Sequence, residues 1–186
     1  AGASALGDSR IENIELMRQA PISSSISLIR SPMLSQADRV VRSSDISFNT
    51  ELEVISKLSS AAKKADRIHG IILMVELGDL REGIIPKDIE SILYKTLKLP
   101  NIAFRGIGAN LACRSGVSPS SKNMGVLSSL AESIEETFDL TVDIVSGGNS
   151  ANLHWALSGV DTGRINNLRL GEAILLGLEP LYGNSI

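Results

Sequence analysis

The segment SGGNS at residues 146–150 carries the residue types best suited to holding a ligand, and it lies within IVSGGNSANL, between two apolar segments. Gly147 and Gly148 allow positive φ and a close backbone approach, while Asn149 and Ser150 offer side chains and N–H groups at a helix start. Such a turn suits an anion. An ordinary glycine-rich turn that caps the next helix is an equally good interpretation of these residues alone.

Two arginines lie in surroundings that suggest a role in a site. Arg169, in NNLRLGEAILLG, stands between apolar residues, so its guanidinium needs a partner inside the fold. Gly171 follows it and could bring a second backbone segment to the same ligand. Arg81, in ELGDLREG, has Asp79 and Glu82 beside it. Each arginine could instead be solvent-exposed. The side chain of Arg169 could reach to the surface, and Arg81 could lie in a solvated loop.

The remaining reactive side chains give no pattern of a nucleophile or a metal site. Cys113 is the single cysteine, and neither His69 nor His154 has a recognisable place beside it, so we expect a small packing residue. Because the two histidines are far apart in sequence and no cysteines are paired, we predict no metal site.

These candidates must be positioned by the elements around them. Short apolar segments alternate with longer amphipathic segments, which is typical of βα units with parallel strands. The sequence predicts strands at 4–7, 25–29, 46–48, 70–77, 102–107, 142–145 and 167–170. It predicts helices at 11–19, 36–42, 51–65, 87–97, 120–138 and 151–157. Asn49 before the third helix, Pro86 before the fourth and Pro119 before the fifth are typical of helix starts.

Seven strands with six helices are one unit short of the eight that close a (β/α)8 barrel, so we predict an α/β fold of this TIM type, incomplete in these residues. An open doubly wound sheet is the alternative, but GIGANL at 106–111 lacks the third glycine of its phosphate-binding turn. Ligands of a barrel bind where its strands end. Polar residues recur at the predicted strand ends, namely Asp8, Arg10, Arg30, Asn49, Asp79, Arg81, Asn110, residues 146–150 and Arg169.

The composition is that of one globular domain over residues 1–186. A 43% hydrophobic content and a net charge of -3 allow a substantial core. Basic residues are dispersed and no apolar run approaches the ~20 residues that span a bilayer, so we expect no nucleic-acid or membrane partner. One cysteine excludes an internal disulfide framework, and we expect a cytoplasmic protein. The opening AGASALG is unlike a signal peptide and is typical of the interior of a longer fold.

Five motifs together resemble the alanine/ornithine racemase family, pyridoxal-phosphate enzymes built on the alanine-racemase-like barrel. They are LGDSRIEN, ELGDLREG, GIGANLAC, VSGGNSANL and INNLRLGEAILLG, and they run from near Leu6 to about Gly177. The resemblance implies pyridoxal 5'-phosphate as the cofactor. It also implies that the lysine-bearing first strand and the C-terminal domain of the family lie outside these residues.

The resemblance assigns the cofactor phosphate to the turn described first. Ser150 and backbone groups at Gly171 would bind the phosphate, with Asn149 and Gly148 in the same turn. This agrees with the residue types, because small residues, hydroxyls and backbone N–H groups are suited to an anion.

Three further residues receive roles from the resemblance. Arg169 would face the pyridine nitrogen, and Arg81 would lie near the phenolic oxygen. Asn110 falls where alanine racemases carry a histidine against the ring. Because an arginine does not give up its proton, Arg169 would leave the ring nitrogen unprotonated and keep carbanion chemistry close to Cα.

The resemblance implies that the parent protein is an amino-acid racemase, a homodimer acting on alanine, ornithine or a related amino acid. It would remove the Cα proton on one face and return one on the other, with one base per face. None of the seven lysines ends a predicted strand, so the Schiff-base lysine is expected upstream of Ala1 and this segment alone is expected to be inactive. The second base, a tyrosine of the partner subunit in alanine racemases, is also expected outside it.

Candidates for the substrate are Asp8, Arg10 and Asp79, although Asp8 could instead pair with Arg10, and Asp79 with Arg81. Two other functions stay open at this point. One is a non-catalytic pyridoxal-phosphate-binding protein, and the other is a barrel that binds a different phosphorylated metabolite.

Overall fold

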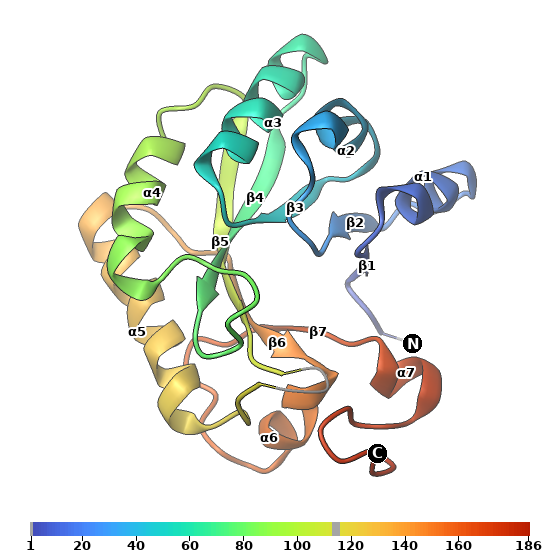
Figure 1. Cartoon of the computed structure of the whole chain (residues 1–186), viewed down its shortest axis with the longest axis vertical. Coiled ribbons are helices and arrows are strands. Elements are labelled where there is room, and N and C mark those ends of the chain that lie inside the picture. The colour runs from blue at the N-terminus through green and yellow to red at the C-terminus, as the bar shows by residue number, and fades with distance from the viewer. Residues whose placement is uncertain (1, 113–115) are drawn as a thin grey trace. The chain divides into compact units, whose positions relative to one another are not determined.

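The computed structural model describes residues 2–112 and 116–186, so Ala1 and the candidate packing residue Cys113 lie outside the described part. Seven strands follow one another in one sheet in chain order. They are β1 (Ala5–Asp8), β2 (Ser25–Leu28), β3 (Ile46–Asn49), β4 (His69–Glu76), β5 (Ile102–Asn110), β6 (Ile144–Asn149) and β7 (Asn167–Arg169). Figure 1 shows the strands alternating with helices along the chain.

Seven α-helices and three short 3-10 turns are found in the described residues. The helices are α1 (Ile11–Gln19), α2 (Ala37–Ser43), α3 (Leu52–Lys64), α4 (Ile89–Thr96), α5 (Ser121–Phe138), α6 (Leu153–Leu157) and α7 (Glu172–Leu176). The 3-10 turns are η1 (Leu34–Gln36), η2 (Pro86–Asp88) and η3 (Ser150–Asn152). The sequence-based prediction missed α7, which is one short turn and too brief for a periodic signal.

The chain divides into two compact units, and each is described by itself. The first unit comprises residues 1–73 and 90–105, and the second comprises residues 74–89 and 106–186. Strands β4 and β5 run from one unit into the other, because each has its first part in the first unit and its last part in the second.

The first unit is held together by a core beneath its helices. In it β1 pairs with β2, β2 with β3 and β3 with β4, all in parallel. Helix α3 buries residues at helical spacing, including Val54, Leu58 and Ala62, and α1 contributes Ile11 and Ile14 to the same core. Strand β4 is buried over its full length up to Val75, as expected of a parallel strand covered on both faces.

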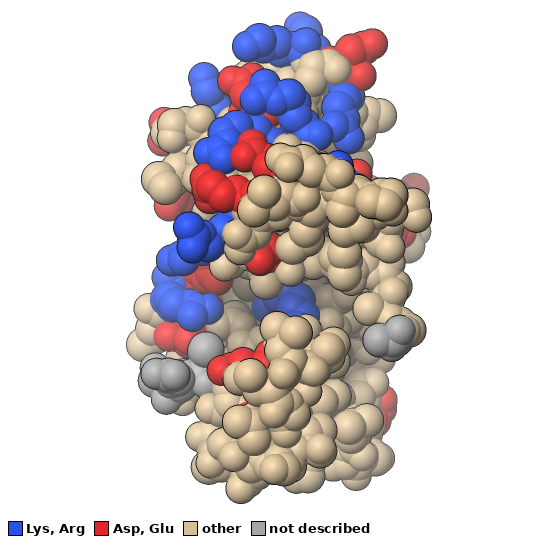
Figure 2. Space-filling model, turned by 90° about the vertical axis from the view of Figure 1, so that its right-hand side faces the viewer, with Lys and Arg blue, Asp and Glu red and all other residues tan. Residues whose placement is uncertain are grey.

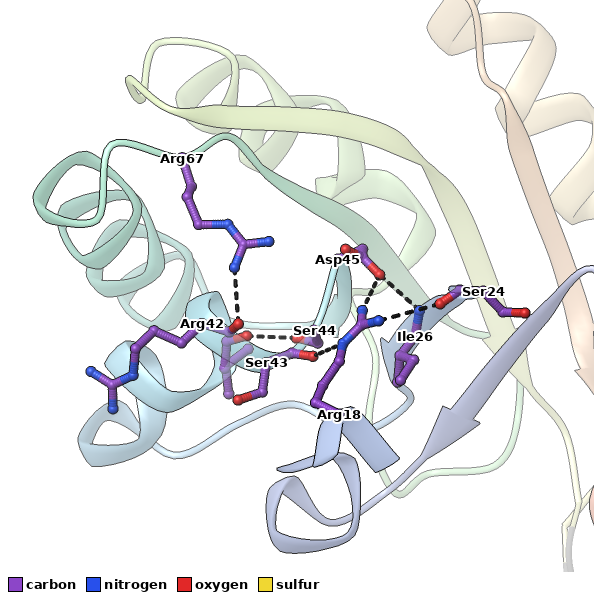
Figure 3. A network of polar contacts seen from close by, with 9 residues as sticks. Arg18, Ser24, Ile26, Arg42, Ser43, Ser44, Asp45 and Arg67 are labelled. Atoms are coloured by element: carbon purple, nitrogen blue, oxygen red, sulfur yellow. Dashed lines mark hydrogen bonds and ion pairs between the residues drawn. The ribbon is translucent and has the colours of Figure 1, made fainter. Parts of the chain in front are cut away.

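Polar groups also fix the first unit, in the network drawn in Figure 3. The Arg18 guanidinium donates to the Ser43 carbonyl at 2.8 Å and to the Asp45 carboxylate at 2.5 Å. The same carboxylate accepts the Ile26 backbone N–H at 2.8 Å. Asp45 thereby ties α1 and β2 to the start of β3, and this is a structural role.

In the second unit, β6 lies between β5 and β7 in parallel pairing. Helix α5 begins at Ser120, whose hydroxyl accepts the Asn123 N–H in a capping box, which confirms the predicted start. Its buried residues Met124, Leu127, Ala131 and Ile134 follow the helical period.

The molecular surface mixes charges of both signs. In Figure 2, Lys and Arg side chains are interspersed with Asp and Glu over the upper part of the view. No helix among the described residues is long and apolar enough to cross a membrane.

Candidate functional site

The predicted anion-binding turn is arranged differently from expectation, because β6 runs through both glycines. Gly147 and Gly148 are strand residues, and the turn begins only at Ser150. The pairing of β6 with β7 shifts between Ser146 and Asn149, so the irregularity covers the glycine pair. Gly148 has a φ of +133°, and a Cβ there would lie 2.2 Å from Asn152 Oδ1. The glycines therefore let a strand bend tightly onto η3, and they do not form a separate loop.

Ser150 is buried and joins the ends of β6 and β7. Its Oγ accepts the Gly171 N–H at 3.2 Å and the Ala173 N–H at 3.1 Å. A Cβ added to Gly171 would meet nothing within 4 Å, so the backbone is open there. Two amides directed at one oxygen beside open space can serve a phosphate oxygen as well as a hydroxyl. The structure therefore brings together Ser150 and the backbone of Gly171, the two groups to which the resemblance assigns the phosphate, and their binding of a phosphate stays a prediction.

Arg169 ends β7 and is bound within the unit, as its apolar neighbours indicated. One terminal nitrogen donates to Ser146 Oγ at 2.5 Å and the other to the Ala109 carbonyl at 2.8 Å. Burial lowers the pKa of Arg169 to about 10, an effect that nearby Glu82 opposes and Arg81 reinforces. The guanidinium therefore keeps its charge at neutral pH, and its two bonds fix its orientation at the ends of β5, β6 and β7.

Arg81 lies on the exposed loop after β4, and its side chain is 54% exposed. Its Nε is 3.5 Å from Asp79 Oδ2, and its Nη2 is 3.6 Å from Glu82 Oε1. The pairing of Asp79 with Arg81 that the sequence left open is therefore present, although both contacts are long.

Asn110 ends β5 and is buried. Its Nδ2 donates to Asp79 Oδ2 at 2.9 Å, and its Oδ1 accepts from Asn149 Nδ2, also at 2.9 Å. The side-chain amide thus bonds to neighbouring loops at both ends. The strand also extends three residues beyond the predicted end at 107, which places Asn110 inside β5.

Asp8 and Arg10 belong to the first unit, at the end of β1. Asp8 accepts the Arg10 backbone N–H at 2.7 Å and the Asn13 side-chain amide at 3.0 Å. The carboxylate therefore orders the entry to α1 through the backbone of Arg10.

Sequence reasoning gave no role to a buried polar group in the first unit. Ser47 Oγ lies 2.8 Å from His69 Nε2 and accepts from Asn49 Nδ2 at 3.0 Å. Because a hydroxyl can donate one hydrogen bond and accept two, Ser47 can satisfy both the Asn49 amide and the ring nitrogen of His69. Burial first, and then Arg67, lower the pKa of His69 to about 4, while Asp45 opposes the shift. The position of His69 at the start of an apolar strand was the feature of the sequence that could have indicated a buried histidine.

No group of three or more metal-ligating side chains occurs among residues 2–112 and 116–186.

The comparisons with known proteins agree on one family. The family model described as alanine racemase, N-terminal domain, matches residues 1–180. The chain is 40% identical to the ornithine racemase of Acetoanaerobium sticklandii and 35% identical to the lysine racemase of Thermotoga maritima, each over 180 residues. Each match covers 96% of this chain and 50% of the relative, so the chain spans about half the length of these curated relatives.

A solved structure shows the same fold. The alanine racemase of Clostridium difficile in complex with cycloserine matches with a TM-score of 0.76 and 18% identity, over 91% of this chain and 46% of that chain. The fold is therefore the predicted alanine-racemase-type (β/α)8 barrel, with seven strands in the described residues.

Proposed function

Because the chain belongs to the family of the alanine racemase N-terminal domain, we propose that it forms the cofactor-binding part of a pyridoxal-phosphate-dependent amino-acid racemase. The observation that carries the proposal is the arrangement around Ser150. Its hydroxyl accepts the N–H groups of Gly171 and Ala173, while the charged side chain of Arg169, at the end of β7, is bound to Ser146 on β6. We further propose that residues 1–186 act as one incomplete barrel domain, which the passage of β4 and β5 through both units supports.

The residues present fit the cofactor. The phosphate would be held by Ser150 and the amides of Gly171 and Ala173, with Asn149 and Gly148 shaping the turn. Arg81, on its exposed loop, would lie near the phenolic oxygen. When bound, pyridoxal phosphate stabilises negative charge at Cα of an amino acid joined to it.

Arg169 would direct that chemistry. Its charge persists at neutral pH and its orientation is fixed, so it would donate a hydrogen bond to the ring nitrogen and retain its proton. Charge would then stay near Cα, which favours return of a proton at Cα over transamination.

The lysine that a pyridoxal enzyme requires would come from outside these residues. All seven lysines lie in the described part, and they occupy α3, η2, α4, the segment after α4 and α5. Since no lysine lies at the carboxyl end of a strand, we propose that these 186 residues alone do not catalyse racemisation. The second base would also lie elsewhere, and the complete protein would act as a cytoplasmic homodimer.

An amino acid with a cationic side chain is the proposed substrate, which the printed names of the two relatives, ornithine racemase and lysine racemase, support. In the second unit, we propose that the carboxylate of Asp79 binds the cationic side chain of the substrate. Its side chain is only 7% exposed and its contact with Arg81 is long, so it retains capacity for a second cation. Asp8 and Arg10 are weaker candidates because Asp8 already orders the start of α1.

The test is a spectrum of the complete protein with pyridoxal phosphate, before and after borohydride, followed by peptide mass analysis. We expect an absorbance band of a lysine-bound cofactor and a reduced adduct on a lysine other than the seven of residues 1–186. No band, or adducts scattered over surface lysines, would contradict the proposal. Incubation with L-ornithine and chiral analysis then separates a racemase from a non-catalytic cofactor-binding protein, which would bind without producing the D form.

A further inference from the structure

A continuous network of hydrogen bonds links the loop after β4 to the carboxyl ends of β5 and β6 in the second unit. Asp79 accepts from Asn110 at 2.9 Å, and Asn110 accepts from Asn149 at 2.9 Å. Asn149 also donates to the Ala112 carbonyl at 2.7 Å, and its Oδ1 accepts the Ala151 N–H at 2.8 Å. The network of hydrogen bonds thus ends on the turn that contains Ser150.

The carboxylate of Asp79 sets which group donates and which accepts along this network of hydrogen bonds. An ionised carboxylate can only accept, so the amide of Asn110 must turn its NH2 group toward Asp79 and its oxygen toward Asn149. Asn149 must then present its own NH2 group to Asn110, which leaves its oxygen for the Ala151 N–H. The Ala112 carbonyl and the Ala151 N–H orient Asn149 in the same sense, so the amide of Asn110 is fixed from both ends, by Asp79 on one side and by Asn149 on the other.

Burial makes the direction costly to reverse. Asn110 is 6% exposed and the Asp79 side chain is 7% exposed, so water cannot replace a lost partner easily. A reversed Asn110 would place its oxygen against the carboxylate and its NH2 group against that of Asn149. The hydrogen bond between Asn110 and Asn149 therefore links the η3 turn, which begins at Ser150, to Asp79 on the loop after β4.

We propose that Asp79, Asn110 and Asn149 form a positioning relay through which the loop after β4 orders the phosphate-binding turn at Ser150. This inference rests on the proposed function. It assigns Asn110 a task different from the ring contact that the family resemblance implies for its position, because both ends of its amide bind protein groups. A consequence is that a ligand held at Asp79 and the phosphate held at Ser150 affect each other's affinity.

The test measures the dissociation constant of pyridoxal phosphate for the complete protein by absorbance titration. The variants are Asp79→Ala, Asn110→Ala and the double variant. We expect each single substitution to weaken binding roughly tenfold, because it removes a hydrogen bond and leaves a buried polar group unpaired. The double variant should bind pyridoxal phosphate no more than about twofold more weakly than Asn110→Ala, because both substitutions interrupt the same network of hydrogen bonds.

The matched control is Asn166→Ala. Asn166 also uses both ends of its amide, accepting from Val145 N–H at 2.9 Å and donating to the Asp143 carbonyl at 2.9 Å, at the start of β6. This variant should lose stability and keep the affinity for pyridoxal phosphate. Thermal melting of every variant without cofactor separates loss of folding from loss of binding.

Asn110→Asp supplies a readout that a general packing role would not change. At neutral pH its carboxylate would face that of Asp79 and weaken binding, whereas the protonated acid can donate to Asp79 as the amide does. The affinity of this variant relative to the unaltered protein should therefore recover as the pH is lowered from 8 to 5.

If the unaltered protein binds pyridoxal phosphate, two results would overturn the relay. One is a dissociation constant of the single variants that stays within twofold of the unaltered protein. The other is a double variant in which the increases of the two single variants multiply. A pH-independent ratio for Asn110→Asp would do the same. If the unaltered protein does not bind pyridoxal phosphate, the proposed function fails and the relay fails with it.

Discussion

Arg169 has a structural task that the structure shows, and the proposed function adds a chemical one. Its two terminal nitrogens bind Ser146 Oγ and the Ala109 carbonyl, which joins three strand ends. Its charge persists because even after burial its pKa is about 10. The sequence predicted a buried arginine at this position from its apolar neighbours, but its partners come from residues up to 60 positions away.

Under the proposed function, replacement of Arg169 by Glu in the complete protein should slow racemisation roughly 10- to 100-fold, because the charge-assisted hydrogen bond to the ring nitrogen is lost. It should also increase transamination, since a carboxyl group can share a proton with the ring nitrogen. Rates and both product types are measured by chiral chromatography. Arg164→Gln, which removes an arginine paired with Glu135, is the control, and an unchanged product ratio in Arg169→Glu would disprove the assigned role.

His69 makes the stability of the protein depend on pH. Its folded-state pKa of about 4 lies below the ordinary 6.5, so between these values the unfolded chain binds more protons. Its contribution to stability is complete above pH 6.5 and is lost as the pH falls toward 4. From pH 7 to pH 5 the loss is about 2 kcal/mol by the linkage relation.

The measurement is urea unfolding at pH 7 and pH 5 for the unaltered protein and for His69→Gln, whose side-chain amide can still form a hydrogen bond with Ser47. The variant should lose about 2 kcal/mol less between the two values. Equal losses would show that His69 does not titrate in this range. Glu135, with its pKa lowered to about 2 by its hydrogen bonds from Arg164 and the Val142 N–H, keeps its contribution to stability above pH 5, so it should add little to the difference between pH 7 and pH 5.

At the scale of elements, the strands were predicted closely because each is a short apolar segment between polar residues. The largest error is at the carboxyl ends of β5 and β6, which extend through Asn110 and Asn149. These extensions contain glycines and polar residues that usually end a strand. Pairing with the neighbouring strand extends both strands past these residues, and glycine allows the backbones to approach closely there. Together these effects outweighed the local preference of glycine and polar residues to end a strand.

Gly106 lies at one such approach, where β5 meets β6. Its φ is +150°, and a Cβ there would lie 1.9 Å from the Ile144 carbonyl oxygen. Gly106→Ala should therefore destabilise the fold by about 3 kcal/mol, because the strands must separate. Gly125→Ala in α5 is the matched control. Its Cβ would meet nothing within 4 Å, so a gain of up to about 1 kcal/mol is expected. Denaturant unfolding measures both, and a loss below 1 kcal/mol at Gly106 would contradict the close approach.

At the scale of the whole molecule, the C-terminal residues expose several large apolar side chains. Leu175 is 81% exposed and Tyr182 is 77% exposed, with Ile174, Leu176 and Ile186 also exposed. Groups of exposed apolar side chains are typical of association surfaces. We expect this segment to contribute to self-association of the chain.

Leu175→Glu should reduce the apparent mass of the chain in light scattering at high concentration, because it places a charge in the apolar segment. Leu157→Glu, at a side chain that is 71% exposed on α6, should leave the mass unchanged. Equal behaviour of the two variants would exclude a specific role for the C-terminal segment.

The sequence by itself determined the family, the alternation of strands and helices along the chain, and the residues that are proposed for the site. Motifs and short-range periodicity are local properties, so Ser150, Arg169 and Gly171 could be named from their neighbours in the chain. Only the tertiary structure decided what those side chains bind. The link from Asp79 through Asn110 to Asn149, the neutral state of His69 and the path of β6 through two glycines all depend on residues distant in sequence. Such contacts arise from the pairing of parallel strands, whose register no local pattern contains.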